Sequence, residues 1–97
     1  MWARVSHIKG SPDRVESGIR NFKEAVIPAG REMAGFKGGY LLVERESGRF
    51  MGITLWETEE ALRKSVEAAN RLRAQAAETA AASEPPIVEV YEVAVEP

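Results

Sequence analysis

The sequence predicts an α+β protein of the ferredoxin-like type, a β-α-β-β-α-β sandwich built on one antiparallel sheet. Runs of β-branched, aliphatic and aromatic residues predict four strands, at Trp2–Ile8, Phe36–Arg45, Phe50–Trp56 and Ile87–Val95. Segments with apolar residues at helical spacing separate the first strand from the second and the third from the fourth. Right-handed crossovers then place both helices on one face of the sheet, and the other face needs a second copy of the chain to cover it.

The first predicted strand has two distinct sides because side chains alternate along a strand. One side carries Trp2, Arg4, Ser6 and Ile8, and the other carries Ala3, Val5 and His7. Gly10 ends the strand, and Ser11 is well suited to cap a helix that begins at Pro12.

The first predicted helix buries a stripe formed by Val15, Ile19, Phe22 and Val26. Pro28 predicts that this helix ends or kinks near Val26, because a proline ring clashes with the preceding turn. A short extra turn from Ala29 to Met33, closed by Gly35, is expected before the second strand.

The central hairpin is the most strongly patterned part of the chain. The run Tyr40–Val43 is apolar on both sides, which predicts a strand covered on both faces. Gly48 marks the turn, since glycine adopts positive φ without strain. Three further glycines predict bulges or a surface that another group approaches closely: Gly38, Gly39 and Gly52.

The second helix is predicted from Thr58, a good cap, to about Ala82, with a break near Asn70. Its buried side is expected to carry Leu62, Val66, Ala69, Leu72 and Ala76. The sequence Glu84-Pro85-Pro86 stops the helix before the last strand.

Composition limits the classes of function. At 97 residues, the chain is expected to form one domain, 1–97. A net charge of −2 argues against nucleic-acid binding, which needs a basic surface. The absence of cysteine excludes disulfides and thiolate chemistry, and a single histidine excludes a multi-histidine metal site within one chain. No apolar run is long enough to span a membrane, so a cytoplasmic location is expected.

The middle of the chain resembles the antibiotic biosynthesis monooxygenase-like (ABM) family of dimeric α+β barrel proteins. The resemblance lies in Pro28, in the stretch Gly35-Phe36-Lys37-Gly38-Gly39-Tyr40-Leu41-Leu42, and in Thr54-Leu55-Trp56-Glu57-Thr58-Glu59-Glu60-Ala61-Leu62. It implies a homodimer whose two sheets pack together, with a cleft between sheet and helices in each subunit. It also implies cofactor-independent oxygenation of aromatic compounds for some members.

The haem-degrading branch of that family is disfavoured. Its members carry an asparagine on the first strand, a tryptophan at the end of the third and an iron-binding histidine on the second helix. The matching positions here are Ser6, Trp56 and Ser65, so only the tryptophan is kept and the second helix has no histidine.

Three residues are predicted to take part in catalysis: Trp56, Arg4 and Ser6. The Trp56 indole could form a wall of an aromatic pocket, or serve only in packing. Arg4 could stabilise an enolate or phenolate, with Ser6 orienting it, or form an interface salt bridge beside a satisfied serine hydroxyl.

Three residues are predicted to bind substrate: Phe22, Tyr40 and Asn21. Phe22 is expected in the core first and at the cleft second, and for Tyr40 and Tyr91 a place in a dimer interface is favoured over contact with a substrate. His7 points away from Ser6 and has no evident carboxylate partner in the sequence, which favours a structural role over that of a general base.

Two functions remain open from sequence. The first is a cofactor-independent monooxygenase acting on a small aromatic or enolisable compound. The second is a non-catalytic dimeric protein that binds small molecules or acts in a stress response. No phosphate-binding loop, nucleophile motif or metal-ligand spacing is present, so neither hypothesis includes a cofactor or metal.

Overall fold

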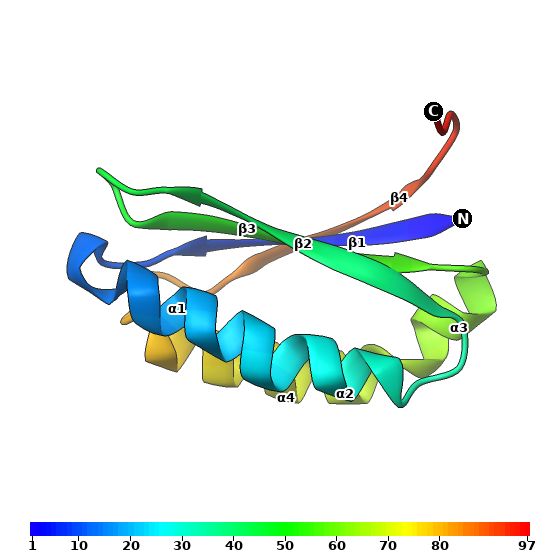
Figure 1. Cartoon of the computed structure of the whole chain (residues 1–97), viewed down its shortest axis with the longest axis horizontal. Helices are drawn as coiled ribbons and strands as arrows, with labels where there is room; N and C mark the ends of the chain where they lie inside the picture. Colours follow the sequence, from blue (N-terminus) through cyan, green and yellow to red (C-terminus); the bar gives the residue numbers. More distant parts are fainter.

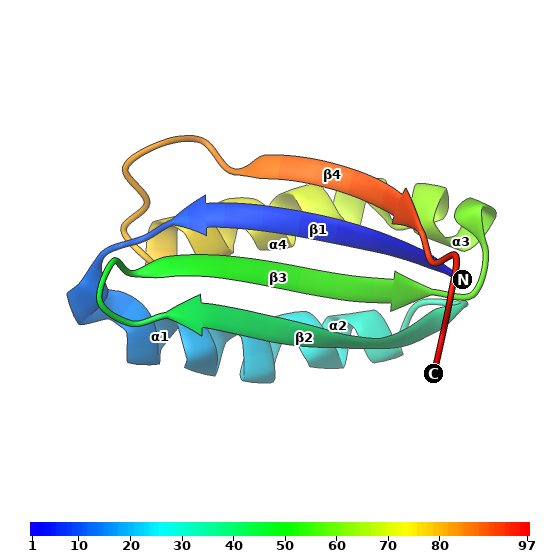
Figure 2. The same ribbon diagram turned by 90° about the horizontal axis from the view of Figure 1, so that it is seen from above.

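The computed structural model describes residues 1–97 as two layers, with a four-stranded sheet above a layer of helices (Figure 1). The strands are β1 (Trp2–Lys9), β2 (Phe36–Glu44), β3 (Arg49–Trp56) and β4 (Ile87–Glu92). Every neighbouring pair is antiparallel, in the order β2-β3-β1-β4 (Figure 2).

The helices all lie on one face of this sheet (Figures 1 and 2). The first group is η1 (Pro12–Arg14), α1 (Val15–Asn21), η2 (Phe22–Val26) and α2 (Ile27–Arg31), and the second is α3 (Glu59–Lys64) and α4 (Val66–Thr79). The ferredoxin-like β-α-β-β-α-β architecture predicted from the sequence is therefore confirmed.

Pro28 predicts that the first helical segment ends or kinks near Val26; the segment does not end there, but its regular α-helical hydrogen bonding is interrupted just before Pro28. The segment η2 is a π-helical turn, and the helix continues as α2 with Pro28 in its first turn. In a regular α-helix the ring of Pro28 would clash with the carbonyl four residues earlier. Because a π turn shifts hydrogen bonding to the fifth residue, the widened turn lets the helix continue past the ring.

The second helix breaks at Ser65, not near Asn70 as predicted. The Ser65 hydroxyl donates a hydrogen bond of 2.6 Å to the Leu62 carbonyl, and a serine that bonds back to the preceding turn in this way bends a helix. The bend also turns Val66 outward, so the prediction that Val66 is buried is wrong.

The last strand ends at Glu92, three residues earlier than predicted. Trp2, the first residue of β1, pairs with Glu92, so β1 has no further residue to extend the ladder. A single backbone hydrogen bond of 2.9 Å, from Val93 N–H to the Met1 carbonyl, follows before the chain leaves the sheet.

The strand glycines accommodate a bulge and a close approach, as predicted. Gly38 has a φ of 126°, and the register between β2 and β3 shifts there. A Cβ atom on Gly39 would lie 2.8 Å from the Ile53 carbonyl oxygen, so this position needs glycine, whereas a Cβ atom on Gly52 would make an ordinary contact of 3.6 Å with the Phe22 ring of η2. The group that approaches Gly39 closely is thus part of the protein's own sheet.

Side chains are buried between the two layers at both ends, with Trp56 and Leu62 at the end where the second helical segment begins. Ile8, Val15, Phe50 and Ala80 form the buried apolar cluster at the end where β1 leads into the first helix. Further along, the layers enclose a cavity, which is described below.

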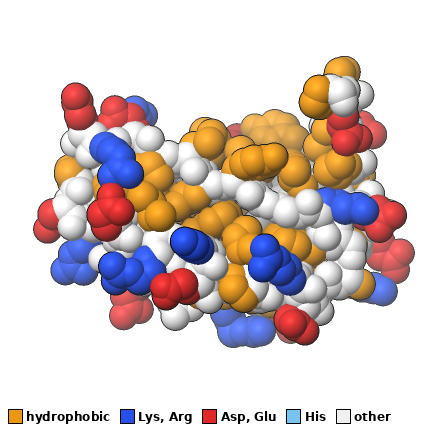
Figure 3. All heavy atoms as spheres, viewed as in Figure 1, with side chains coloured by type: hydrophobic (Ala, Val, Ile, Leu, Met, Phe, Trp, Pro, Cys, Tyr) orange, Lys and Arg blue, Asp and Glu red, His pale blue; other side chains and the backbone are white.

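The opposite face of the sheet carries no helix (Figure 1), and large apolar side chains are exposed on it. Tyr40 is 63% exposed, Leu42 51% and Ile87 64%. In the space-filling view, hydrophobic side chains gather along the upper edge, which is this open face (Figure 3). None of the helices has the length and apolar character needed to span a membrane.

Candidate functional site

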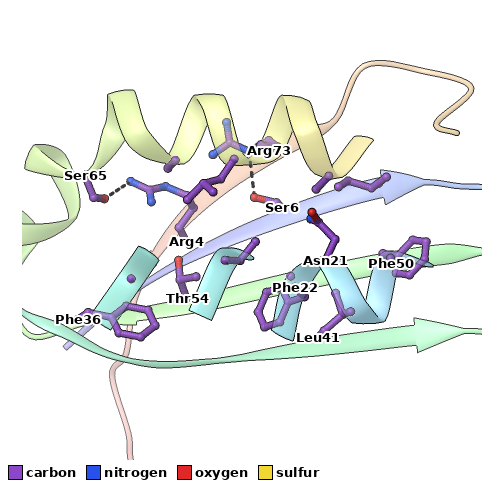
Figure 4. Close-up of a pocket in the computed structure, with 18 of the residues that line it drawn as sticks. Arg4, Ser6, Asn21, Phe22, Phe36, Leu41, Phe50, Thr54, Ser65 and Arg73 are labelled. Carbon is purple, nitrogen blue, oxygen red and sulfur yellow. Dashed lines mark hydrogen bonds between the residues drawn. The ribbon is translucent and has the colours of Figure 1, made fainter. Parts of the chain in front are cut away.

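A cavity of about 90 Å³ lies between the sheet and the helices. This is several times the roughly 10–15 Å³ that one water molecule needs. Its walls are mostly apolar, and they include three phenylalanine rings and Leu41 (Figure 4). Small residues on α4 and the strand glycine Gly52 leave the space open. The polar groups that line it are few: Arg4, Ser6, Asn21, Thr54, Ser65 and Arg73.

Arg4 extends from β1 towards the second helical segment and is only 5% exposed. Its Nη2 donates to the Leu62 carbonyl at 2.9 Å and to the Ser65 hydroxyl at 3.0 Å (Figure 4). The guanidinium also lies 5.7 Å from the centre of the Trp56 ring, in cation–π geometry. Arg4 is therefore fixed from one side by the helix break and supported by the indole.

Arg73 reaches the same cavity from α4. Its Nε donates to the Ser6 hydroxyl on β1 at 3.1 Å (Figure 4), and its Nη1 donates to the Asn70 side-chain carbonyl at 2.8 Å. The first bond joins the two layers, and the second lies on the solvent side. Arg73 thus stands at the rim of the cavity, while Arg4 lies deeper.

No aspartate or glutamate lines the cavity, and neither arginine forms a salt bridge. Burial, and secondarily the nearby positive charge of Arg73, lowers the pKa of Arg4 from its ordinary value to about 10. Burial also lowers the pKa of Arg73. The cavity therefore holds two positive charges without an acidic partner, which is costly unless something compensates them.

Trp56 closes one end of the cavity and is 2% exposed. Its ring packs edge-on against Phe36, with centroids 5.3 Å apart, and its Nε1–H donates to the Thr54 hydroxyl at 3.0 Å. The indole N–H is thus already used within the protein. Trp56 therefore contributes its ring to the site, as a surface that supports the Arg4 guanidinium.

The structure brings five of the six predicted site residues to this cavity: Arg4, Ser6, Asn21, Phe22 and Trp56. Tyr40 is not among them, because alternation along β2 places it on the open face of the sheet, paired with Ile53. Their roles in binding or catalysis stay predictions.

His7 lies on the open face too, as alternation predicts, but it has a carboxylate partner. Its Nε2 is 2.7 Å from a Glu89 carboxylate oxygen on β4. The sequence suggested no such partner, because only the β1–β4 register brings residues 7 and 89 together.

Sequence reasoning missed Arg73 and treated Ser65 only as the position matching the haem-ligating histidine. The inward stripe of the second helical segment is Ser65, Ala69, Leu72, Arg73, Ala76 and Ala80. Arg73 lies four residues after Ala69 and three before Ala76, so its helical spacing was the available signal. The Ser65 hydroxyl is bonded to Arg4 and Leu62, which does not fit a haem ligand. No group of three or more His, Cys, Asp or Glu side chains is placed to hold a metal.

Comparison with solved structures shows which fold this is. A monooxygenase from the Streptomyces coelicolor gene ActVA-Orf6, solved with the ligand nanaomycin D, matches with a TM-score of 0.78 and 19% identity, over 99% of this chain and 91% of that one. A candidate antibiotic biosynthesis monooxygenase from Nitrosomonas europaea matches with a TM-score of 0.73 and 15% identity, over 98% of this chain and 100% of that one. The chain has the ABM fold.

Sequence relatives add no activity to this ABM-fold chain. No family model matches it. Two uncharacterised proteins of Mycobacterium tuberculosis are similar: Rv2558, 42% identical over 79% of this chain, and Rv2557, 35% identical over 97% of it. The chain spans only 33% and 41% of their respective lengths.

Proposed function

We propose that this ABM-fold protein binds a small aromatic or enolisable compound in the cavity and oxygenates it without a cofactor. The observation that carries the proposal is an apolar cavity whose deepest polar group, Arg4, is a buried cation without an acidic partner. Such a cation stabilises an oxyanion strongly, because the surroundings exclude water. The similar fold of the Streptomyces monooxygenase supports oxygenation in particular.

The proposed reaction uses the electrons of the substrate itself. A phenol that loses its proton becomes an electron-rich anion, and O₂ adds to the ring carbon opposite the oxygen. One oxygen atom stays on that carbon, and the second leaves as water with the two hydrogens that the phenol loses, which gives a quinone. The substrate supplies all four electrons that O₂ accepts, so no external reductant takes part.

The residues have distinct roles in this proposal. No carboxylate or imidazole lines the cavity, so the protein lowers the pKa of the substrate and leaves the proton to water. Arg4 would hold the anionic oxygen, Trp56 would support Arg4, and Ser6 would orient Arg73 through their hydrogen bond. The phenylalanine rings and Phe22 in particular would hold the aromatic body.

Oxygen uptake with 1-naphthol and related phenols tests the proposal. We expect uptake that needs the protein, with the quinone and water as products. Arg4→Met should lower the rate by about 10²-fold or more, as loss of an oxyanion-stabilising donor does. Arg45→Met, at an exposed arginine on the hairpin turn, should leave the rate unchanged. Full turnover in Arg4→Met or in Trp56→Ala would contradict the assigned roles.

The absence of a proton acceptor from the cavity favours a second function, which is binding without catalysis. On this alternative the same ligands bind, but no oxygen is consumed with any phenol tested. Saturable binding of 1-naphthol together with zero oxygen uptake would select this function over the first.

We also propose that two copies pair through the open face of the sheet. The support is its row of exposed apolar side chains, which include Tyr40, Leu42 and Ile87. Sedimentation of the wild-type protein at micromolar concentration should give twice the mass of the chain, and Leu42→Arg should give the mass of one chain. Arg20→Glu, on the outer surface of α1, is the matched control and should stay dimeric. A monomeric wild type would overturn the pairing.

A further inference from the structure

The guanidinium of Arg4 has donors to spare on its cavity side. Both of its hydrogen bonds to protein come from Nη2, so the N–H groups on Nε and Nη1 have no protein acceptor. No side-chain nitrogen or oxygen in the protein is both completely inaccessible and without a hydrogen-bond partner. Nε and Nη1 of Arg4 therefore keep some accessible surface, although Arg4 as a whole is only 5% exposed. Nη2 of Arg73 is likewise not used in its two hydrogen bonds.

The charges around this space are unbalanced. Two arginines from opposite layers line one apolar cavity, and none of its lining residues is acidic. The other lysines and arginines of the chain are exposed to water, and four of them also have a carboxylate partner, as in the pairs Lys9–Glu84 and Arg45–Glu16. A neutral aromatic ligand would displace water from both guanidinium groups and leave their charges uncompensated, which is unfavourable. An anionic ligand would compensate them.

Geometry favours a carboxylate among the anions. A carboxylate has two acceptor oxygens, so one oxygen can accept from Nε or Nη1 of Arg4 while the other accepts from Nη2 of Arg73. The remaining walls are aromatic and aliphatic, which suits an apolar body attached to that group. The volume of about 90 Å³ limits the body to a small ring system.

We propose that the ligand is a small aromatic carboxylate, bound as its anion by Arg4 and Arg73 with its ring against Phe22 and the neighbouring apolar wall. This inference rests on the proposed function only because both place the ligand in the same cavity. It adds that the compound is charged before any reaction begins, whereas oxygenation alone requires an anion only during the reaction. It also assigns Arg73 a direct contact with the ligand.

A matched pair of probes tests the charge. Benzoate and benzamide have nearly the same shape and differ in charge, and their binding can be measured by calorimetric titration of the full chain. We expect wild-type protein to bind benzoate at least tenfold more tightly than benzamide. Arg4→Met and Arg73→Met should each remove most of this preference, and Arg45→Met should preserve it.

The second variant, Gly52→Ala, changes the shape of the cavity and keeps the charges of both arginines. A Cβ atom at Gly52 would lie 3.6 Å from Phe22, an ordinary contact, so Gly52→Ala should fold normally. Because Gly52 lines the cavity, the added methyl should weaken benzoate and benzamide binding by similar factors. This separates loss of space from loss of charge, and it remains informative if an arginine variant fails to fold.

The outcomes distinguish this inference from the proposed function. Equal affinity for benzoate and benzamide would overturn the inference, whatever the oxygen uptake. A benzoate preference that survives in the double variant Arg4→Met, Arg73→Met would overturn it as well. Selective benzoate binding in a protein that never consumes oxygen would support the inference and overturn the monooxygenase.

Discussion

Arg4 and His7 stand three residues apart on β1 and show how differently the two faces of the sheet treat a basic side chain. His7 points to the open face, where a Glu89 carboxylate oxygen lies 2.7 Å from it. Arg4 points to the helices, where it is buried against Trp56 and Ser65 with no carboxylate within the cavity. On the open face the basic side chain has a carboxylate partner within the protein, whereas on the enclosed face the positive charge of Arg4 has none and is available to a ligand.

This difference indicates where a ligand should act. An exposed pair such as His7–Glu89 contributes little to stability, because water screens it. A buried cation without a partner is unfavourable in the empty protein, and that cost can be recovered when an anion binds. A chain folds with such a feature when the burial of its other residues offsets the cost, and Trp56, Leu62 and Phe50 supply such burial here.

The largest expected effect comes from removing the support of Arg4. Trp56→Ala should lower the free energy of unfolding by about 3–5 kcal/mol, because a nearly fully buried indole leaves a cavity behind. Val66→Ala, at an exposed position on α4, should change it by less than about 0.5 kcal/mol. Urea unfolding of both variants gives the comparison. A loss below about 1 kcal/mol in Trp56→Ala would show that the indole is not part of the packed structure.

Removing the charge of Arg4 should have a smaller effect, of the opposite sign. Arg4→Met keeps an apolar chain of similar length and eliminates a charge that burial disfavours, so we expect equal or greater stability, by up to about 2 kcal/mol at pH 7. The Leu62 carbonyl keeps its hydrogen bond from Ser65. Arg45→Met is the control for a general loss of positive charge. A strong destabilisation by Arg4→Met would mean that Arg4 is a structural cation rather than a ligand-binding one.

The difference in stability between Arg4→Met and wild type should depend on pH in a defined direction. The pKa of Arg4 is about 10 in the folded protein, below its ordinary value, so the unfolded chain binds the Arg4 proton more tightly. Below pH 10 the penalty on the folded state is fully present, and it declines as the pH rises above about 10. The stability advantage of Arg4→Met should therefore be constant from pH 7 to 9 and shrink above pH 10, as measured by urea unfolding. An advantage that grows above pH 10 would contradict the lowered pKa.

The smallest effect is expected on the open face. The hydrogen bond with His7, and secondarily one with Tyr91, lowers the pKa of Glu89 below its ordinary value of 4.5. A carboxylate with a lowered pKa stabilises the fold above its unfolded pKa and loses that contribution as the pH falls through its folded pKa. Wild type should be slightly more stable than Glu89→Gln at neutral pH, and the difference should shrink as the pH falls below 4.5, as followed by thermal unfolding. A difference that does not shrink in acid would rule out the carboxylate as its source.

Alternation along the strands made most of the site predictable. With a period of two, Arg4 and Ser6 share the face that the helices cover, and the same reasoning places His7 on the other side. Asn21 and Phe22 reach the cavity because they lie at the π-helical turn beside it. The fold was predictable because each strand and helix carries its own periodic pattern.

The remaining features depend on tertiary contacts that no local pattern encodes. The break at Ser65 is associated with the bond between its hydroxyl and the Leu62 carbonyl, and Val66 turns outward as a result. Arg73 has the helical spacing of the inward stripe, but its bond to Ser6 depends on the packing of α4 against β1. The helix continues past Pro28 because the preceding turn is π-helical, and the general tendency of proline to end a helix does not predict this.

The most direct test of the uncompensated cation pair is to observe the arginine Nε–H resonances by NMR while benzoate is added. We predict that the signals of Arg4 and Arg73 shift in a saturable way, with those of the exposed Arg45 and Arg63 unmoved, and that benzamide produces much smaller shifts. Shifts confined to the exposed arginines, or equal shifts with both probes, would contradict an anion site between the sheet and the helices.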